Sequence, residues 1–288
     1  MDLEKIKKKK TISELLEFGI INIDKPSGPT SFDVSDFVRK KLDLRKTSHF
    51  GTLDPKVTGV LPIALNRACK LTGFFLGENK EYVGIMRFHE EVSLEKIREI
   101  IQKKFSGKIM QKPPVKSRVK RVEREREIVY FEIFEQDEKG KDFLFKTEVQ
   151  GGTYIRKLID DLGKELGIGA HMLELRRTRA GIFDEATIVN LYDFEKAVDE
   201  YKSGDEDKLR KMIIPGEIIT ELYPTINVKK EIVQRLFNGS PLFMKDVKDK
   251  VDSQRCCVFS EEKLIGIYSV INSGEIFAKP EFVLQPIK

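Results

Sequence analysis

The chain contains no tryptophan and only three cysteines, Cys69, Cys256 and Cys257. These are too few for a disulfide framework, and none of them belongs to a Cys-x-x-Cys pair of the kind that binds a metal. The three histidines are dispersed and form no cluster of metal ligands. We therefore expect a protein without a metal site that works in the reducing environment of the cytoplasm.

Long apolar segments are absent from the sequence as well. No run approaches the length that crosses a membrane, so we expect no membrane partner. Five lysines occur within the first ten residues, but neither the apolar segment nor the cleavage site of a secretory signal follows them. We interpret residues 1–18 as a basic N-terminal extension. The abundance of lysine, glutamate and isoleucine is typical of a heat-adapted organism.

Basic residues are concentrated in one segment. The formal net charge of the chain is +5, and residues 112–126 hold seven basic and two acidic residues, so this segment alone matches the excess of the whole chain. It begins with Pro113-Pro114 and shows no helical apolar period, which favours a protruding loop. Such a basic loop is suited to contact phosphates. A charge run is equally compatible with a plain solvated face.

Apolar periodicity predicts helices and β-rich runs predict strands along much of the chain. Helices are predicted at 12–18, 31–42, 93–105 and 155–166. A buried strand is predicted at 20–24, and the runs 128–134 and 143–149 form a predicted antiparallel hairpin. Antiparallel strands mixed with helices, without a βαβα rhythm, indicate the α+β class.

The character of the chain changes near Leu222. Pro215, Gly216 and Pro224 punctuate the approach to this point. Beyond it, the sequence predicts one short helix and several short strands separated by turns. Segments of this kind suggest a small β-barrel. We therefore expect a large domain at residues 19–222 and a small one at 223–288.

The strongest chemical signal lies in residues 48–62, with the sequence SHFGTLDPKVTGVLP. Pro55 biases Asp54 toward an extended backbone. Gly51 and Gly59 on either side permit tight turns and the close approach of another molecule. A carboxylate on such a loop can point into a cleft, although a bare Asp-Pro pair is more often an ordinary turn.

This string resembles the catalytic motif of the TruB family of pseudouridine synthases, in which the aspartate, here Asp54, is essential. Three further segments match the family in the same order: 25–31 (KPSGPTS), 80–82 (KEY) and 152–177, which runs from GTYIR to LELRR. The resemblance spans residues 19 to about 183. It implies the family's fold, a mixed, largely antiparallel sheet with flanking helices, and an enzyme that isomerises uridine in RNA.

The resemblance also implies roles for individual residues. Asp54, Tyr82 and Arg156 are the expected catalytic residues: Tyr82 lies against the target base, and Arg156 pairs with the carboxylate and keeps it ionised. The expected substrate-binding residues are His49, Tyr154, Leu175 and Lys25. The reaction breaks N1–C1′ and rejoins the uracil through C5 without redox change, so we expect no cofactor. Whether Asp54 acts as a nucleophile or as a base stays open.

The chain departs from the family's pattern beside His49. The family has glycine before this histidine and a small residue after it, whereas this chain has Ser48 and Phe50. The departure affects the expected placement of His49 beside the extruded nucleotide rather than that of Asp54.

Residues 113–117 and 169–179 resemble most the dyskerin branch of the family, found in archaea and eukaryotes. Its members are the catalytic subunits of H/ACA guide-RNA particles, and segment 223–288 resembles the PUA domain that accompanies many RNA-modifying enzymes. The resemblance implies guide RNA, ribosomal RNA, the T-arm of transfer RNA and small protein subunits as partners. It also implies a thumb loop at about 112–127. The expected RNA contacts are Lys116, Arg118, Lys120, Arg121 and Arg124.

Three alternatives remain open at this point. The chain could be a stand-alone enzyme for the T-arm of transfer RNA, a non-catalytic RNA-binding scaffold, or an RNA hydrolase that uses Asp54. The presence of Asp54, Tyr82 and Arg156 together argues against a scaffold. The motif loops offer no second carboxylate and no metal site for a hydrolase.

Overall fold

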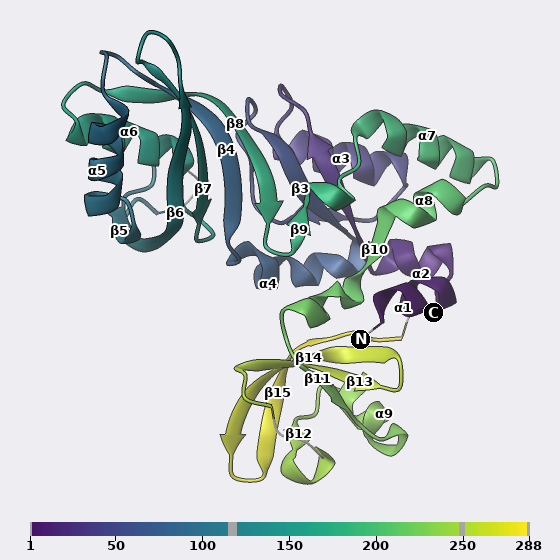
Figure 1. Cartoon of the computed structure of the whole chain (residues 1–288). Helices are drawn as coiled ribbons and strands as arrows, with labels where there is room; N and C mark the ends of the chain where they lie inside the picture. Colours follow the sequence, from purple (N-terminus) through teal and green to yellow (C-terminus); the bar gives the residue numbers. More distant parts are fainter. Residues whose placement is uncertain (1, 115–119, 248–250, 287–288) are drawn as a thin grey trace.

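The computed structural model describes residues 2–114, 120–247 and 251–286. Two β-sheets organise these residues: a large one of ten strands and a smaller one of five (Figure 1). In the large sheet the order is β10-β1-β3-β8-β4-β7-β6-β5, with β2 paired to β3 and β9 paired to β8. Its strands are β1 (Gly19–Lys25), β2 (Thr47–His49), β3 (Thr58–Leu65), β4 (Lys80–Phe88), β5 (Gly107–Gln111), β6 (Arg124–Gln136), β7 (Asp142–Val149), β8 (Ala170–Ala180), β9 (Phe183–Asp184) and β10 (Ile213–Pro215).

The large sheet is mixed. Strands β3 and β8 run parallel, and the other neighbouring strands of this sheet pair antiparallel. The predicted α+β class and the mixed, largely antiparallel sheet are confirmed. The predicted hairpin is also present as β6 and β7, and both strands extend beyond the predicted bounds.

One short helix, Val233–Phe237, lies beside the smaller sheet, and the others lie against the large sheet or at its ends (Figure 1). The helices are α1 (Leu3–Lys9), α2 (Ile12–Glu17), α3 (Ser31–Lys41), α4 (Thr72–Leu76), α5 (Leu94–Lys104), α6 (Ile155–Glu165), α7 (Leu191–Lys202), α8 (Asp207–Met212) and α9 (Val233–Phe237). The side chains of Thr11, Thr30 and Ser93 cap α2, α3 and α5, because each accepts a backbone N–H of the first turn. None of the helices in the described ranges has the length and apolar character that a membrane crossing requires.

The sequence did not predict α7 and α8. Their segment is rich in charged residues, which obscures the helical apolar period. Helix α7 is nevertheless amphipathic: Phe194, Ala197 and Val198 are buried on one face, while charged residues cover the other. Leu209 anchors α8 in the same way.

The smaller sheet follows the large one in the chain. Its order is β11-β13-β14-β15-β12, and its strands are β11 (Thr225–Asn227), β12 (Leu242–Phe243), β13 (Arg255–Ser260), β14 (Lys263–Ser273) and β15 (Ile276–Val283). The sheet is curled around its own apolar cluster, which includes Val258, Ile265 and Phe277. A second cluster joins it to the large sheet, where the rings of Phe18 and Phe282 stack 6.1 Å apart.

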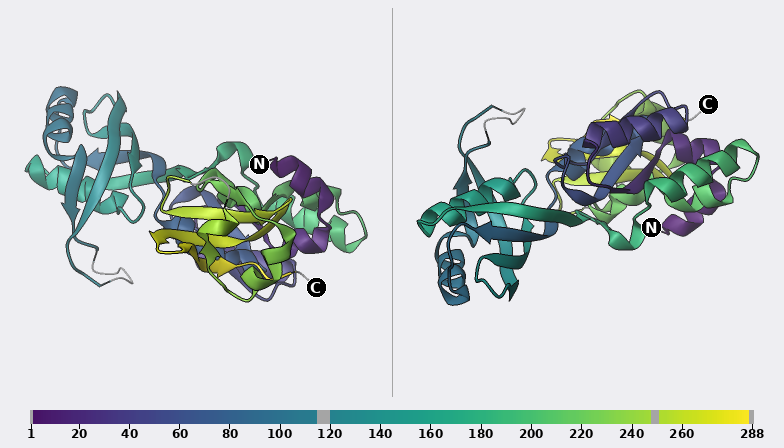
Figure 2. Two further views of the ribbon diagram at one scale, coloured as in Figure 1. Left: turned by 90° about the horizontal axis from the view of Figure 1, so that it is seen from below. Right: turned by 90° about the horizontal axis from the view of Figure 1, so that it is seen from above.

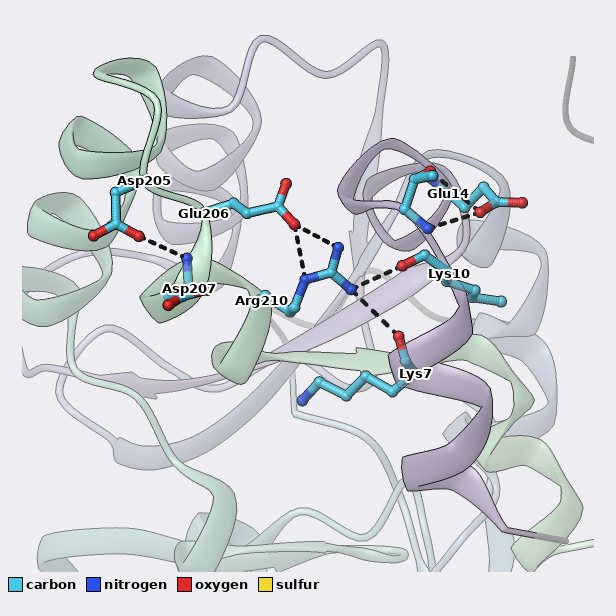
Figure 3. A network of polar contacts seen from close by, with 8 residues as sticks. Lys7, Lys10, Glu14, Asp205, Glu206, Asp207 and Arg210 are labelled. Atoms are coloured by element: carbon cyan, nitrogen blue, oxygen red, sulfur yellow. Dashed lines mark hydrogen bonds and ion pairs between the residues drawn. The ribbon is translucent and has the colours of Figure 1, made fainter.

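The lysine-rich N-terminus forms a helix, which the sequence did not predict. Arg210 of α8 donates to the carbonyl oxygens of Lys7 and Lys10, at 3.3 and 2.8 Å, and to the carboxylate of Glu206 (Figure 3). The ammonium of Lys10 lies 2.6 Å from the carboxylate of Glu217, which is almost completely buried. The protein therefore uses part of this basic segment for its own packing.

The parallel contact of β3 with β8 leaves no room for a side chain at Gly59. Its φ is +100°, and a Cβ there would lie 2.2 Å from the carbonyl oxygen of Arg177. We expect Gly59→Ala to lower the free energy of unfolding by at least about 2 kcal/mol, because the methyl group strains the backbone and forces the strands apart. Denaturant unfolding measures the difference.

The matched control is Gly73→Ala in α4, where a Cβ meets nothing within 4 Å. Alanine favours a helix, so this change should not destabilise the protein. An equal loss of stability in both variants would contradict the steric argument.

Candidate active site

Asp54 lies on a loop between β2 and β3. The N–H of Val57 donates to the carbonyl oxygen of Asp54 at 3.0 Å, which closes a tight turn. Leu53 and Val57 are buried and anchor the turn, whereas the side chain of Asp54 is 46% exposed. The backbone of the turn is therefore fixed by packing while the carboxylate faces outward, where it can meet another molecule.

Both chain neighbours of Asp54 are held by the segment that follows β1. Ser31 Oγ accepts the N–H of Leu53 at 2.8 Å and donates to its carbonyl oxygen at 3.1 Å. On the other side, the N–H of Gly28 donates to the carbonyl oxygen of Pro55 at 2.9 Å. Residues 25–31 therefore support the loop of Asp54 on both sides.

Lys25 also holds the loop of Asp54 in place. Its side chain is completely buried, and Nζ donates to the carbonyl oxygens of Pro55 and Pro26 at 2.9 and 2.8 Å. Burial lowers the pKa of Lys25, and the nearby charge of Asp54 acts in the opposite direction. The structure thus gives Lys25 a position behind the loop, bonded to the main chain.

Arg156 comes from the first turn of α6 and pairs with Asp54. Its Nε lies 2.9 Å from Oδ2 of the carboxylate, and the two side chains are 53% and 46% exposed. Ion pairs this exposed contribute little to stability, about 0–1 kcal/mol. The pair therefore orients the carboxylate and supplies its counter-charge rather than holding the fold together.

Tyr82 and Arg177 form the floor beneath the loop. They are register partners on β4 and β8, and both side chains are buried. The guanidinium of Arg177 donates to the carbonyl oxygens of Val60 and Gly51 at 2.7 and 3.0 Å, so it ties both ends of the loop to β8. Burial lowers the pKa of Arg177, and the Tyr82 phenol favours its charged form. No pattern in the sequence indicated this role for Arg177.

Lys80 is a second buried cation to which the sequence analysis gave no role. Its ammonium donates to the carbonyl oxygens of Phe75, Leu76 and Glu78, at 3.1, 2.8 and 2.6 Å, and so closes the end of α4. Burial, with the charge of Arg177, lowers the pKa of Lys80 to about 8. Lys80 is the first residue of the matching segment 80–82 (KEY), so the resemblance marked its position but not its role.

The side chains of His49 and Phe50, at the start of the loop, lie in different surroundings. His49 Nε2 lies 3.0 Å from the hydroxyl of Thr52 on the site side. Burial, with the charge of Arg177, lowers the pKa of His49 and so favours the neutral imidazole. Phe50 turns to the interior, where its ring stacks on Phe75 at 4.7 Å and lies 5.7 Å from the ring of Phe183. The unusual size of residue 50 is therefore accommodated in the core.

The remaining expected substrate residues lie on β8 and at the start of α6. Leu175 is buried and lies next to Gly84. A Cβ added to Gly84 would lie 2.8 Å from Cδ1 of Leu175. Tyr154 is the N-cap residue of α6, and its N–H donates to the side chain of Gln111 at 2.8 Å. Gln111 was not singled out in the sequence.

The other two histidines are close to each other and occupy the far ends of β4 and β8. His89 Nε2 and His171 Nδ1 are 3.1 Å apart, and both side chains are exposed. Across the described ranges, no three His, Cys, Asp or Glu side chains gather in a metal-binding arrangement.

The basic loop is shorter than predicted. Arg124 and Arg126 belong to β6, where Arg124 pairs with Gln111, so the loop ends at residue 123 and not at 127. Lys120 and Arg121 are exposed, in a segment that leaves the sheet (Figure 2). Lys116 and Arg118 lie outside the described residues.

A cavity of about 100 Å³ opens at the base of the loop. It is lined by Gln111, Pro113, Arg124, Arg126, Gly152 and Tyr154.

Comparison with known families agrees with this geometry. A model described as "TruB family pseudouridylate synthase (N terminal domain)" matches residues 39–155. A second, described as "tRNA pseudouridylate synthase B C-terminal domain", matches residues 156–220. The two ranges adjoin at α6 and together include Asp54, Tyr82, Arg156 and Leu175.

Several proteins are similar over most of the chain. A probable tRNA pseudouridine synthase B of Pyrococcus abyssi is 46% identical over 239 residues, which cover 81% of this chain and 70% of that protein. The protein of the same name from Methanopyrus kandleri is 46% identical over 232 residues, with 80% and 68% covered.

Solved structures are similar over nearly the whole chain. One, titled "Crystal Structure of a Cbf5-Nop10-Gar1 Complex", has a TM-score of 0.88 at 37% identity and covers 97% of this chain and 89% of that one. Another, titled "Structure of H/ACA RNP bound to a substrate RNA containing 2'-deoxyuridine", has a TM-score of 0.86 at 35% identity, with 97% and 89% covered. The chain is therefore a member of the TruB family, a pseudouridine synthase that isomerises uridine in RNA.

Proposed function

We propose that Asp54 is the catalytic carboxylate and that an H/ACA guide RNA selects the uridine by base pairing. One observation carries the first part: the Asp54–Arg156 pair, at 2.9 Å, stands on a loop whose main chain is bonded on both sides. Attack on the sugar or base, or removal of a sugar proton, requires an ionised carboxylate in a fixed position. The loop supplies the fixed position, and Arg156 places a cation beside the carboxylate.

The neighbouring residues support this chemistry. The target uracil must leave its stack before its reacting atoms become accessible. The ring of Tyr82 offers a surface for the extruded base, and a contact of this kind is worth about 1–3 kcal/mol. Leu175 supplies an apolar wall, while Tyr154 and His49 bound the entry. The reaction needs no redox step, and we propose no cofactor.

The choice of a guided mechanism rests on the structures that the chain resembles. By their titles, one of those cited above is an H/ACA RNP bound to a substrate RNA, and the other is a Cbf5-Nop10-Gar1 complex. We propose ribosomal RNA as the main substrate and small protein subunits as partners. The T-arm of transfer RNA is proposed as a second substrate, because the curated relatives are named for transfer RNA. The cytoplasm is the proposed location.

We propose that different parts of the chain have different functions. Residues 19–222 form the catalytic domain. The basic loop acts as a thumb that contacts RNA phosphates through Lys116, Arg118, Lys120 and Arg121, and Arg124 at the start of β6 adds a further contact. Residues 223–288 form a PUA-like domain that binds the guide, and the curled sheet beginning at Thr225 supports this assignment. Residues 1–18 form a basic extension packed against the body.

We expect Asp54→Asn to reduce the single-turnover rate of pseudouridine formation by at least about a thousandfold, because the amide cannot act as a nucleophile or a base. RNA affinity and melting temperature should stay near the wild-type values, since the change is nearly isosteric. The control is Asp43→Asn, at an exposed residue with φ of +53° that asparagine also adopts. A rate for Asp54→Asn within tenfold of wild type would refute the assignment.

We expect neutralisation of Lys120 and Arg121 by glutamine to weaken binding of unrelated RNAs alike. Each lost phosphate contact should reduce the slope of log affinity against log salt by roughly 0.7–0.9. Filter binding at several salt concentrations measures the slope. The charge-matched control neutralises Lys196 and Lys202, two exposed lysines of α7. An unchanged slope in the loop variant would show that the basic run is only a solvated face.

We expect modification of a ribosomal RNA fragment only when a matched H/ACA guide and the partner proteins are present. The protein reads RNA shape and backbone, so the sequence information must come from base pairing. Sequencing after chemical labelling of pseudouridine locates the product. A transfer RNA T-arm offered without a guide tests the second substrate. Equal modification of the ribosomal fragment with and without guide would overturn the guided mechanism and leave a stand-alone enzyme.

A further inference from the structure

Gln111 is a buried polar residue at the base of the basic loop. It is the last residue of β5, pairs with Arg124 on the neighbouring strand β6, and is only 3% exposed. A buried side-chain amide must find hydrogen-bond partners, since leaving it unpaired costs about 1–3 kcal/mol. The partners of Gln111 are therefore a structural requirement of this junction.

Both partners are main-chain groups of one residue, Tyr154. The N–H of Tyr154 donates to Oε1 of Gln111 at 2.8 Å, and Nε2 of Gln111 donates to the carbonyl oxygen of Tyr154 at 3.2 Å. The same carbonyl oxygen accepts the first backbone bond of α6, from Leu158. Two bonds to one residue's main chain fix both its position and its orientation. Tyr154 is two residues before Arg156, so the start of α6 is fixed where the arginine begins.

The preceding glycines are held from two sides. A Cβ on Gly151 would lie 2.4 Å from the carbonyl oxygen of Leu76 at the end of α4, and one on Gly152 would lie 3.2 Å from Nη2 of Arg126 on β6. The segment 151–154 is thus confined between α4 and the strands that carry the basic loop. Within that loop, Arg121 donates to the carbonyl oxygen of Pro113 at 3.3 Å, which joins its two ends.

We propose that Gln111 is a positioning residue for catalysis, which holds the Arg156 guanidinium at Asp54 and couples that position to the base of the RNA-binding loop. The proposal rests on the proposed roles of Asp54 and Arg156. Their pair is half-exposed, so its own energy contributes little to holding the guanidinium in place. A displacement of about 1 Å at a catalytic group can cost about a hundredfold in rate, so the start of α6 needs an external brace. Gln111 provides it.

The first test is Gln111→Met, which keeps the length of the side chain and removes both bonds. We expect the single-turnover rate at saturating RNA to fall by about tenfold or more, while the dissociation constant for RNA changes by less than about threefold. The matched control is Gln102→Met, at an exposed glutamine of α5, with no change in either quantity.

The second test, Gln111→Glu, gives a readout that lost packing alone would not produce. In this variant an ionised carboxylate would accept from the N–H of Tyr154 but could not donate to its carbonyl oxygen, whereas the protonated acid would do both. The rate of the Q111E protein relative to wild type should therefore rise as the pH falls. Arg124 and Arg126 line the same cavity and favour the ionised form, so they lower the pH at which recovery begins without changing its direction.

The coupling is tested by combining Gln111→Met with neutralisation of Lys120 and Arg121. At saturating RNA, we expect the loop changes to slow the chemical step in the wild-type background and to have little further effect beside Gln111→Met. Strict additivity would overturn the coupling. A Gln111→Met protein that melts earlier but turns over like wild type when folded would overturn the positioning role. An inactive wild type would instead refute the proposed function, so the two failures are distinguishable.

Discussion

The active site depends on hydrogen bonds from buried cations to main-chain carbonyl oxygens. Lys25 binds the carbonyl of Pro55, and Arg177 binds those of Gly51 and Val60, so the loop of Asp54 is held beneath its centre and at both ends. A buried charge is tolerated only when its donors are satisfied. Because the loop carbonyls satisfy them, a displaced loop would leave these cations unpaired in the interior. That penalty keeps the loop in one conformation while the carboxylate of Asp54 stays exposed.

These carbonyl partners are neutral, so they do not cancel the positive charge beneath the loop. Asp54 is the acidic group that acts on Lys25 from the site side. Positioning the main chain and orienting the carboxylate are therefore the tasks of different residues, whereas a single ion pair would combine them. The buried cations position the main chain, and the exposed Arg156 orients the carboxylate, where it remains free to exchange this contact for contacts with a nucleotide.

The sequence predicted what is encoded locally. The apolar faces of α3, α5 and α6 depend on residues only one or two turns apart, and these predicted helices are present. The resemblance supplied Asp54 and its partner Arg156. What the sequence could not show depends on distant segments: Gln111 meets Tyr154 across 43 residues of chain. Local charge also misled, because it hid the amphipathic α7 and assigned Arg124 to a loop although it belongs to β6.

The order of strands explains why motifs scattered along the chain make one site. Lys25 pairs with Gly59, Gly59 with Arg177, and Arg177 with Tyr82, so these residues form a single row across β1, β3, β8 and β4. Each comes from a different motif of the sequence. The row depends on the parallel contact of β3 with β8, which is close enough to exclude a Cβ at Gly59. The tight packing of two strands thus sets the distance between the loop of Asp54 and the floor formed by Tyr82, and with it the space in which a uracil must turn.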